Sequence, residues 1–96
     1  MIDDTPWAPH EPAVRLRGMA VDDAMQRRGL GRRVLEFAMG RAAMTYAPLT
    51  TLWCNARLIA VPFYESMGFE IHGERFEIEG IGPHYVMHRA LPQAFA

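Results

Sequence analysis

Two glycines one residue apart, Gly29 and Gly31, stand at the start of a segment with helical periodicity. Apolar residues recur every three to four positions after them, which predicts an amphipathic helix over Leu30–Tyr46 that ends before Pro48. The first N–H groups of a helix have no partner within it, and the positive end of the helix dipole attracts anions. Glycine lets a backbone turn tightly and approach a ligand closely. The pair therefore predicts a phosphate site at the mouth of this helix.

The basic residues of the chain are concentrated around this predicted site. The net charge is only −1 at pH 7, which argues against a general nucleic-acid or membrane binder. Six of the ten basic residues nevertheless fall between positions 15 and 33, namely Arg15, Arg17, Arg27, Arg28, Arg32 and Arg33. This distribution indicates a local anion site, so a phosphate-bearing cofactor is the first functional hypothesis. The glycines form neither a dinucleotide fingerprint, which needs a third glycine, nor a P-loop, which needs Gly-Lys-Ser/Thr.

Cysteine content and hydropathy favour a cytoplasmic protein. Cys54 is the only cysteine, so no intramolecular disulfide framework is expected, and its apolar neighbours predict a small core side chain. The sequence shows neither a signal-peptide pattern nor an apolar run of about 18 residues. We therefore expect no membrane partner and no nucleic-acid partner.

The chain has the length of one α/β domain with a thin core. Residues 1–12 contain three prolines among polar residues, which predicts an irregular arm before a domain over 13–96. The expected elements are a strand over Ala13–Val21, the helix Leu30–Tyr46, a short buried strand over Leu49–Cys54, a second helix ending at about Met67, and two antiparallel strands over Phe69–Ile78 and Pro83–Leu91. The first three elements make a βαβ unit, whose strands should be parallel.

Several polar residues are candidates for chemistry, and each has a structural alternative. Asn55 directly follows the second predicted strand, where parallel strands collect ligands, or it is a turn residue that satisfies its own backbone. Tyr64 is either a core aromatic with its hydroxyl in water or a general acid for a leaving group. His84 is either a structural histidine or a proton carrier. His84 and His88 share a strand face about 13 Å apart, too far to bind one ion, so no metal site is expected.

Taken together, these segments resemble the GNAT superfamily of N-acyltransferases. The matching blocks, over residues 13–91, are Met19-Ala20-Val21-Asp22, Gln26-Arg27-Arg28-Gly29-Leu30-Gly31, Asn55-Ala56-Arg57, Ala60-Val61-Pro62-Phe63-Tyr64-Glu65, Met67-Gly68-Phe69 and Gly80-Ile81-Gly82-Pro83-His84-Tyr85-Val86-Met87. The second block is similar to the family's Q/R-x-x-G-x-G/A acyl-CoA motif, and the next three to its N-A-x-x-x-A-x-x-F-Y-E-x-x-G-F segment. The resemblance implies a GNAT-like α/β fold: a βαβ unit with parallel, splayed strands, then a short helix and an antiparallel β-hairpin.

The resemblance also implies a cofactor and roles for individual residues. The cofactor would be acetyl-CoA or another acyl-CoA, and the acceptor a primary amine of a small molecule or a protein amino terminus. Met19 and Val21 would pair through their backbone with the pantetheine arm, and Asn55 would contact it. Tyr64 would be the general acid for the CoA thiolate. The backbone over residues 27–32 would bind the pyrophosphate, and the other positions implied for cofactor contact are Ala20, Gln26, Arg27, Arg28, Gly29, Leu30, Gly31, Arg32 and Phe63.

Two departures from the family pattern add further expectations. The resemblance covers the C-terminal, acyl-CoA-binding portion of the family fold, without the N-terminal portion that completes the sheet and shapes the acceptor pocket. Such a domain has an open sheet edge, so we expect a homodimer or a partner chain. The first strand also carries no glutamate of the kind that many members use as a base. The alternative to an N-acyltransferase is therefore a non-catalytic acyl-CoA-binding or interaction module.

Overall fold

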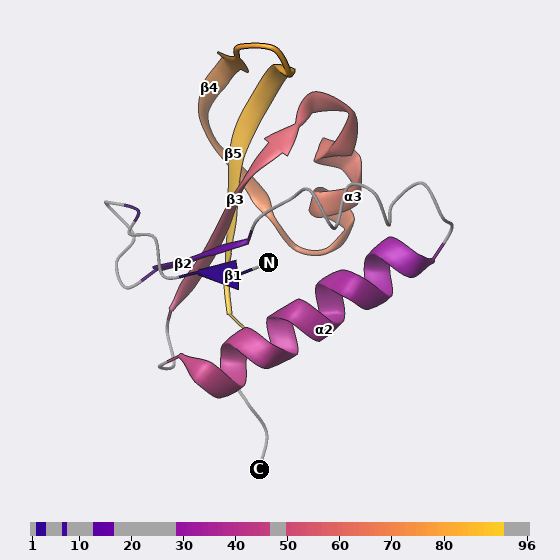
Figure 1. Cartoon of the computed structure of the whole chain (residues 1–96), viewed down its shortest axis with the longest axis vertical. Coiled ribbons are helices and arrows are strands. Elements are labelled where there is room, and N and C mark those ends of the chain that lie inside the picture. The colour runs from indigo at the N-terminus through magenta and orange to yellow at the C-terminus, as the bar shows by residue number, and fades with distance from the viewer. Residues whose placement is uncertain (1, 4–6, 8–12, 17–28, 47–49, 92–96) are drawn as a thin grey trace.

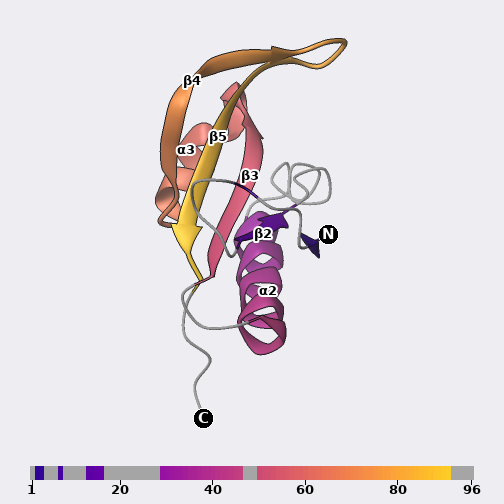
Figure 2. The same ribbon diagram turned by 90° about the vertical axis from the view of Figure 1, so that its left-hand side faces the viewer.

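The computed structural model describes residues 2–3, 7, 13–16, 29–46 and 50–91, which form a five-stranded sheet in the order β1-β2-β3-β5-β4 with helices α2 and α3 on one side (Figures 1 and 2). The elements are β1 (Ile2–Asp3), β2 (Ala13–Leu16), α2 (Leu30–Thr45), β3 (Thr51–Arg57), the single-turn 3₁₀ helix η1 (Leu58–Ala60), α3 (Val61–Ser66), β4 (Glu70–Ile78) and β5 (Gly82–Ala90). The expected α/β class is confirmed.

The βαβ unit forms as the sequence predicts. Strands β2 and β3 pair in parallel, with Val14 opposite Leu52 and Arg15 opposite Trp53, and helix α2 lies between them in the chain. Residues 17–21, the second half of the predicted first strand, lie outside the described residues. Helix α2 ends at Thr45 with Tyr46 as its C-cap, within one residue of the expected end.

Strand β3 is longer than expected and continues to Arg57 instead of ending at Cys54. The added residues Asn55, Ala56 and Arg57 pair with residues of β5 in an antiparallel ladder. Backbone pairing with a neighbouring strand therefore overrides the low strand propensity of asparagine. As a consequence, Asn55 is neither a turn residue nor a residue that follows the strand.

The C-terminal half folds as expected into a short helix and a long hairpin. Pro62 lies in the first turn of α3, and Gly68, with a φ of 89°, follows the helix at its C-terminal end. Strands β4 and β5 are antiparallel and meet at a turn where Gly80 has a φ of 79°. Their register shifts between His72 and Phe76, which marks an irregularity in the ladder. Figure 1 shows the tip of this hairpin extending beyond the end of β3.

The N-terminal arm is not wholly irregular, contrary to expectation. Ile2–Asp3 form the short strand β1, which pairs antiparallel with β2 through Ile2 opposite Leu16. The edge of β2 that we expected to be open is therefore paired over these two residues. Further along the arm, the Trp7 ring stacks on Trp53 of β3, with ring centroids 5.9 Å apart.

The core lies between the sheet and the two helices. Alternate residues of β3 point toward α2 and α3, and Leu52 and Cys54 are fully buried there. They pack in one cluster with Leu35 of α2 and with Met87 of β5. Fully burying an aliphatic side chain of this size contributes roughly 1.5–3 kcal/mol. Cys54 is thus a core side chain, as predicted.

Candidate functional site

The N-terminus of α2, called the open helix end below because no side chain among the described residues caps it, lies at the glycine pair. Gly29 is the N-cap residue and has a left-handed backbone with a φ of 78°. Among the described residues, no side chain caps this end, and the first turn carries no acidic residue. The first backbone bond of the helix runs from the N–H of Arg33 to the carbonyl of Gly29, over 3.4 Å. The amides of Leu30, Gly31 and Arg32 therefore precede the helical ladder, where an anion would be their acceptor.

The two glycines serve different purposes at this end. A side chain at Gly29 would meet no atom within 4 Å, so the need for glycine there comes from its positive φ and not from crowding. Gly31, in contrast, is buried within the first turn of α2. The backbone of this turn is therefore accessible at Gly29 and closely packed at Gly31.

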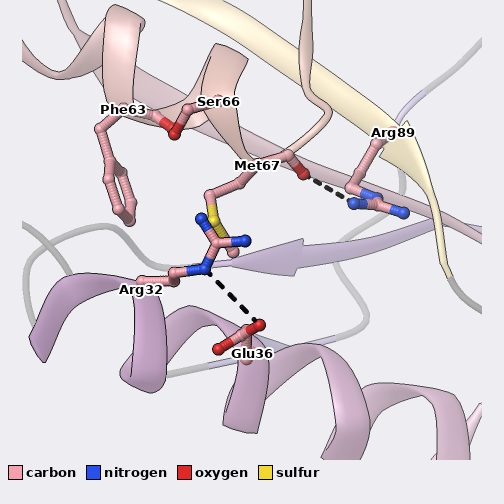
Figure 3. A network of polar contacts seen from close by, with 6 residues as sticks. All are labelled: Arg32, Glu36, Phe63, Ser66, Met67 and Arg89. Atoms are coloured by element: carbon pink, nitrogen blue, oxygen red, sulfur yellow. Dashed lines mark hydrogen bonds and ion pairs between the residues drawn. The ribbon is translucent and has the colours of Figure 1, made fainter. Parts of the chain in front are cut away.

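Positive charge flanks the open helix end. Arg32 and Arg33 are both exposed on the first turn of α2. The Arg32 Nε lies 3.8 Å from Glu36 Oε2, one turn further along (Figure 3). An exposed pair at this spacing contributes only about 0.2–0.5 kcal/mol, so Arg32 would exchange Glu36 for a phosphate at small cost. The other positions implied for cofactor binding, Met19, Ala20, Val21, Gln26, Arg27 and Arg28, lie outside the described residues.

Asn55 lies beyond the last described contact between the parallel strands. Within the described residues, β2 pairs with β3 as far as Arg15 opposite Trp53, whereas β3 continues with β5. Asn55 follows Trp53 by two residues, is exposed, and faces away from the helices because its neighbours Cys54 and Ala56 face the core. Its side chain is thus accessible beside β3, on the sheet face opposite α3.

Tyr64 lies on the other side of the sheet, at the end of the core. Its ring is fully buried on α3, as in the core-aromatic alternative, but the hydroxyl oxygen is buried as well and does not lie in water. The ring packs edge to face on Phe69, with centroids 5.3 Å apart. Phe63 is half-buried, and in Figure 3 it and Arg32 point into the space between α3 and α2. The Phe63 ring also packs edge to face on the Tyr64 ring, with centroids 5.4 Å apart.

The three histidines that the structure describes are a structural one and a packed pair. The Nδ1 of buried His84 donates to the Gly82 carbonyl at 2.8 Å, which favours the structural interpretation of this residue. His72 and His88 come together across the hairpin, with ring centroids 5.9 Å apart, and Trp7 contacts both rings. Across the described residues, no group of three metal-ligating side chains is present. The Trp7 contacts join segments far apart in the sequence, and no local pattern indicates them.

None of the helices in the described ranges has the length and hydropathy needed to cross a bilayer.

Comparison with known proteins relates most of the chain to one family. Residues 9–90 match the acetyltransferase (GNAT) domain. Over 79 residues the chain is 35% identical to an uncharacterized N-acetyltransferase, YitI of Bacillus subtilis (strain 168), covering 82% of this chain and 52% of that protein. The fold is similar to a crystal structure described as a "putative N-acetyltransferase" from Lactobacillus plantarum, with a TM-score of 0.67 and 26% identity over 92% of this chain and 57% of that one. The chain thus spans about half the length of these relatives.

Proposed function

Because this chain belongs to the GNAT acetyltransferase family, we propose that it binds acetyl-CoA, or another acyl-CoA, and transfers the acyl group to a primary amine. The observation that carries the proposal is the N-terminus of α2. Its first amides have no side-chain cap among the described residues, and exposed Arg32 and Arg33 stand on the same turn. This arrangement suits the pyrophosphate of CoA, which is compact and negatively charged.

The proposed path of the cofactor runs from this helix end toward the sheet. The pyrophosphate would accept hydrogen bonds from the backbone over residues 27–32, and Phe63 would contact the cofactor between α2 and α3. The amide-rich pantetheine arm would pair with the backbone of Met19 and Val21 in the manner of an added strand. Asn55 would contact the same arm from the sheet face opposite Tyr64. Support for this path comes from the exposed side chain of Asn55 on β3, on the face that is turned away from the helices.

The proposed chemistry is direct transfer between the thioester and the amine. The amine nitrogen attacks the thioester carbonyl, the new C–N bond forms, and the electron pair of the broken C–S bond leaves on sulfur. The amine proton passes to a base or to solvent. Tyr64 would donate its O–H proton to the departing thiolate, which requires the sulfur to come within about 3 Å of its hydroxyl.

The proposed partners are an acyl acceptor and a second protein chain. The acceptor would be a small-molecule amine or a protein amino terminus. A homodimer, or a partner chain, would complete the acceptor side. Exposed apolar side chains on α2, Phe37 and Met44, support an additional contact surface.

Two measurements test the proposal against the non-catalytic alternative. Calorimetry with CoA tests binding, and release of free thiol from acetyl-CoA across a panel of amines tests turnover. The proposal predicts both, with thiol release reduced by at least about 10-fold in Tyr64→Phe while CoA affinity is retained. CoA binding without thiol release from any amine would establish the non-catalytic module instead. Absence of CoA binding would contradict both.

A further inference from the structure

The C-terminal end of α3 is tied to Tyr64 by several backbone bonds. The Tyr64 carbonyl accepts hydrogen bonds from the N–H groups of Met67 and Phe69, each over 3.0 Å. Gly68, with its φ of 89°, donates to the Glu65 carbonyl over 3.1 Å. This combination is a Schellman cap, and the edge-to-face contact between Phe69 and Tyr64 is the hydrophobic contact that usually accompanies it. The turn over residues 67–69 therefore holds Tyr64 through both its backbone and its ring.

An arginine from the sheet binds this cap. The Arg89 Nη1 on β5 donates to the Met67 carbonyl over 2.6 Å, across 22 positions of sequence (Figure 3). The Arg89 Nε donates to the Ala90 carbonyl over 3.0 Å, which fixes the orientation of the guanidinium. Charge-assisted hydrogen bonds of this kind are among the stronger ones in proteins, and a cation at a helix C-terminus is also favoured by the helix dipole.

The cap and the arginine fit each other closely. A Cβ on Gly68 would lie 2.9 Å from the Arg89 Nη1, closer than real Cβ contacts allow. Glycine at this position is therefore favoured by its positive φ, and a Cβ would also have to displace the end of the Arg89 side chain. The short helix α3, of only six residues, thus gains an anchor to strand β5, which lies between β3 and β4 in the sheet.

We infer that Arg89 is a positioning residue for Tyr64: its bond to Met67 fixes the cap of α3 and thereby the place of the Tyr64 hydroxyl. The catalytic part of this inference rests on the proposed function, whereas the mechanical part does not. Loss of the bond should let the cap relax and Tyr64 shift. Displacement of a reacting group by about 1 Å costs up to about 100-fold in rate, so a partial shift should cost about 10-fold in kcat.

The experiment uses the full chain with ¹³C at the ring ε positions of its three tyrosines, Tyr46, Tyr64 and Tyr85. Arg89→Met removes the donors while keeping an unbranched side chain. Arg89→Lys restores a charged donor, and Arg75→Met, an exposed arginine on β4, is the matched control. Tyr64→Phe assigns the Tyr64 signal. For each variant the ring signals are recorded, and thiol release gives kcat and the KM for acetyl-CoA.

The inference predicts that Arg89→Met moves or broadens the Tyr64 signal and lowers kcat about 10-fold, with KM for acetyl-CoA changed less than about 2-fold. Arg89→Lys should partly restore both the Tyr64 signal and kcat, and Arg75→Met should change neither of them. In a Tyr64→Phe background, Arg89→Met should lower kcat no further. If Arg89→Met does not fold, Arg89→Gln replaces it in the same measurements, with the same expected results.

The possible failures are distinguishable. An unmoved Tyr64 signal in the folded Arg89 variants would overturn the inference, whatever the activity. Equal losses of kcat from Arg89→Met with and without the Tyr64 hydroxyl would overturn it as well, because the two residues would then act independently. A moved Tyr64 signal in a protein that releases no thiol in any form would support the positioning and contradict the proposed function instead.

Discussion

Replacing Gly29 by alanine should destabilise this protein through the backbone alone. Gly29 is the N-cap of α2 with a φ of 78°, and a Cβ at this position would meet no atom within 4 Å. No steric contact therefore adds to the cost of placing an L-residue in the left-handed region, which is roughly 1–2 kcal/mol. We expect Gly29→Ala to lower the free energy of unfolding by about that amount.

Gly40 provides a control in the same helix, because it is exposed, lies inside α2, and would also bring a methyl group within 4 Å of no other atom. Alanine is preferred to glycine in a helix interior by about 0.5–1 kcal/mol. The same chemical change should thus stabilise the protein at position 40 and destabilise it at position 29. Gly29→Asn should lie between Gly29→Ala and the wild type, since asparagine adopts the left-handed conformation more readily than alanine.

Urea unfolding followed by circular dichroism measures both effects. With a slope of about 2 kcal/mol/M, a loss of about 1–2 kcal/mol moves the midpoint by roughly 0.5–1 M. In the proposed function, Gly29→Ala should also weaken CoA binding by about 10-fold, which corresponds to about 1.4 kcal/mol, while Gly40→Ala retains the wild-type affinity. A Gly29→Ala protein as stable as the wild type would refute the described helix start and the reasoning built on it.

Two further predictions concern the charges of the site and the arm. Arg32→Gln should weaken CoA binding several-fold and reduce the salt dependence of that binding, measured by calorimetry at two ionic strengths. Glu36→Gln, which frees Arg32 from its ion pair, should not weaken CoA binding. Equal salt dependence in the wild type and in Arg32→Gln would place the phosphates elsewhere. Trp7→Ala should lower the free energy of unfolding by about 1–3 kcal/mol and shift the fluorescence emission of Trp53 toward that of an exposed indole. Trp7→Phe should retain most of the stability. Unchanged Trp53 emission in Trp7→Ala would show that Trp7 does not cover Trp53.

The elements that the sequence predicted well are those with local signals. Periodicity and the flanking Gly29 define α2, Pro62 and Gly68 bound α3, and the glycines near position 80 mark the hairpin turn. The open helix end was predictable for the same reason, because capping depends on residues that are neighbours in the chain. Parallel pairing of β2 and β3 followed from the βαβ order.

Features that depend on distant residues were not predictable in this way. Strand β3 extends past Cys54 because β5, some thirty positions later, pairs with Asn55 and its neighbours. No local pattern places Trp7, and the sheet register that brings His72 and His88 beneath it leaves no trace in the local sequence. Arg89 stands in an ordinary strand pattern, and only the three-dimensional structure shows its bond to Met67.

The most direct test of the account is an amide NMR titration of the ¹⁵N-labelled chain with CoA, and with pantetheine as a control ligand that lacks the nucleotide and its phosphates. We predict that CoA moves the amide signals of Leu30, Gly31 and Arg32 strongly, that pantetheine moves them little, and that amides at the far end of α2, near Thr45, respond to neither. Binding of CoA that leaves those three amides unmoved would contradict the proposal that the N-terminus of α2 holds the pyrophosphate.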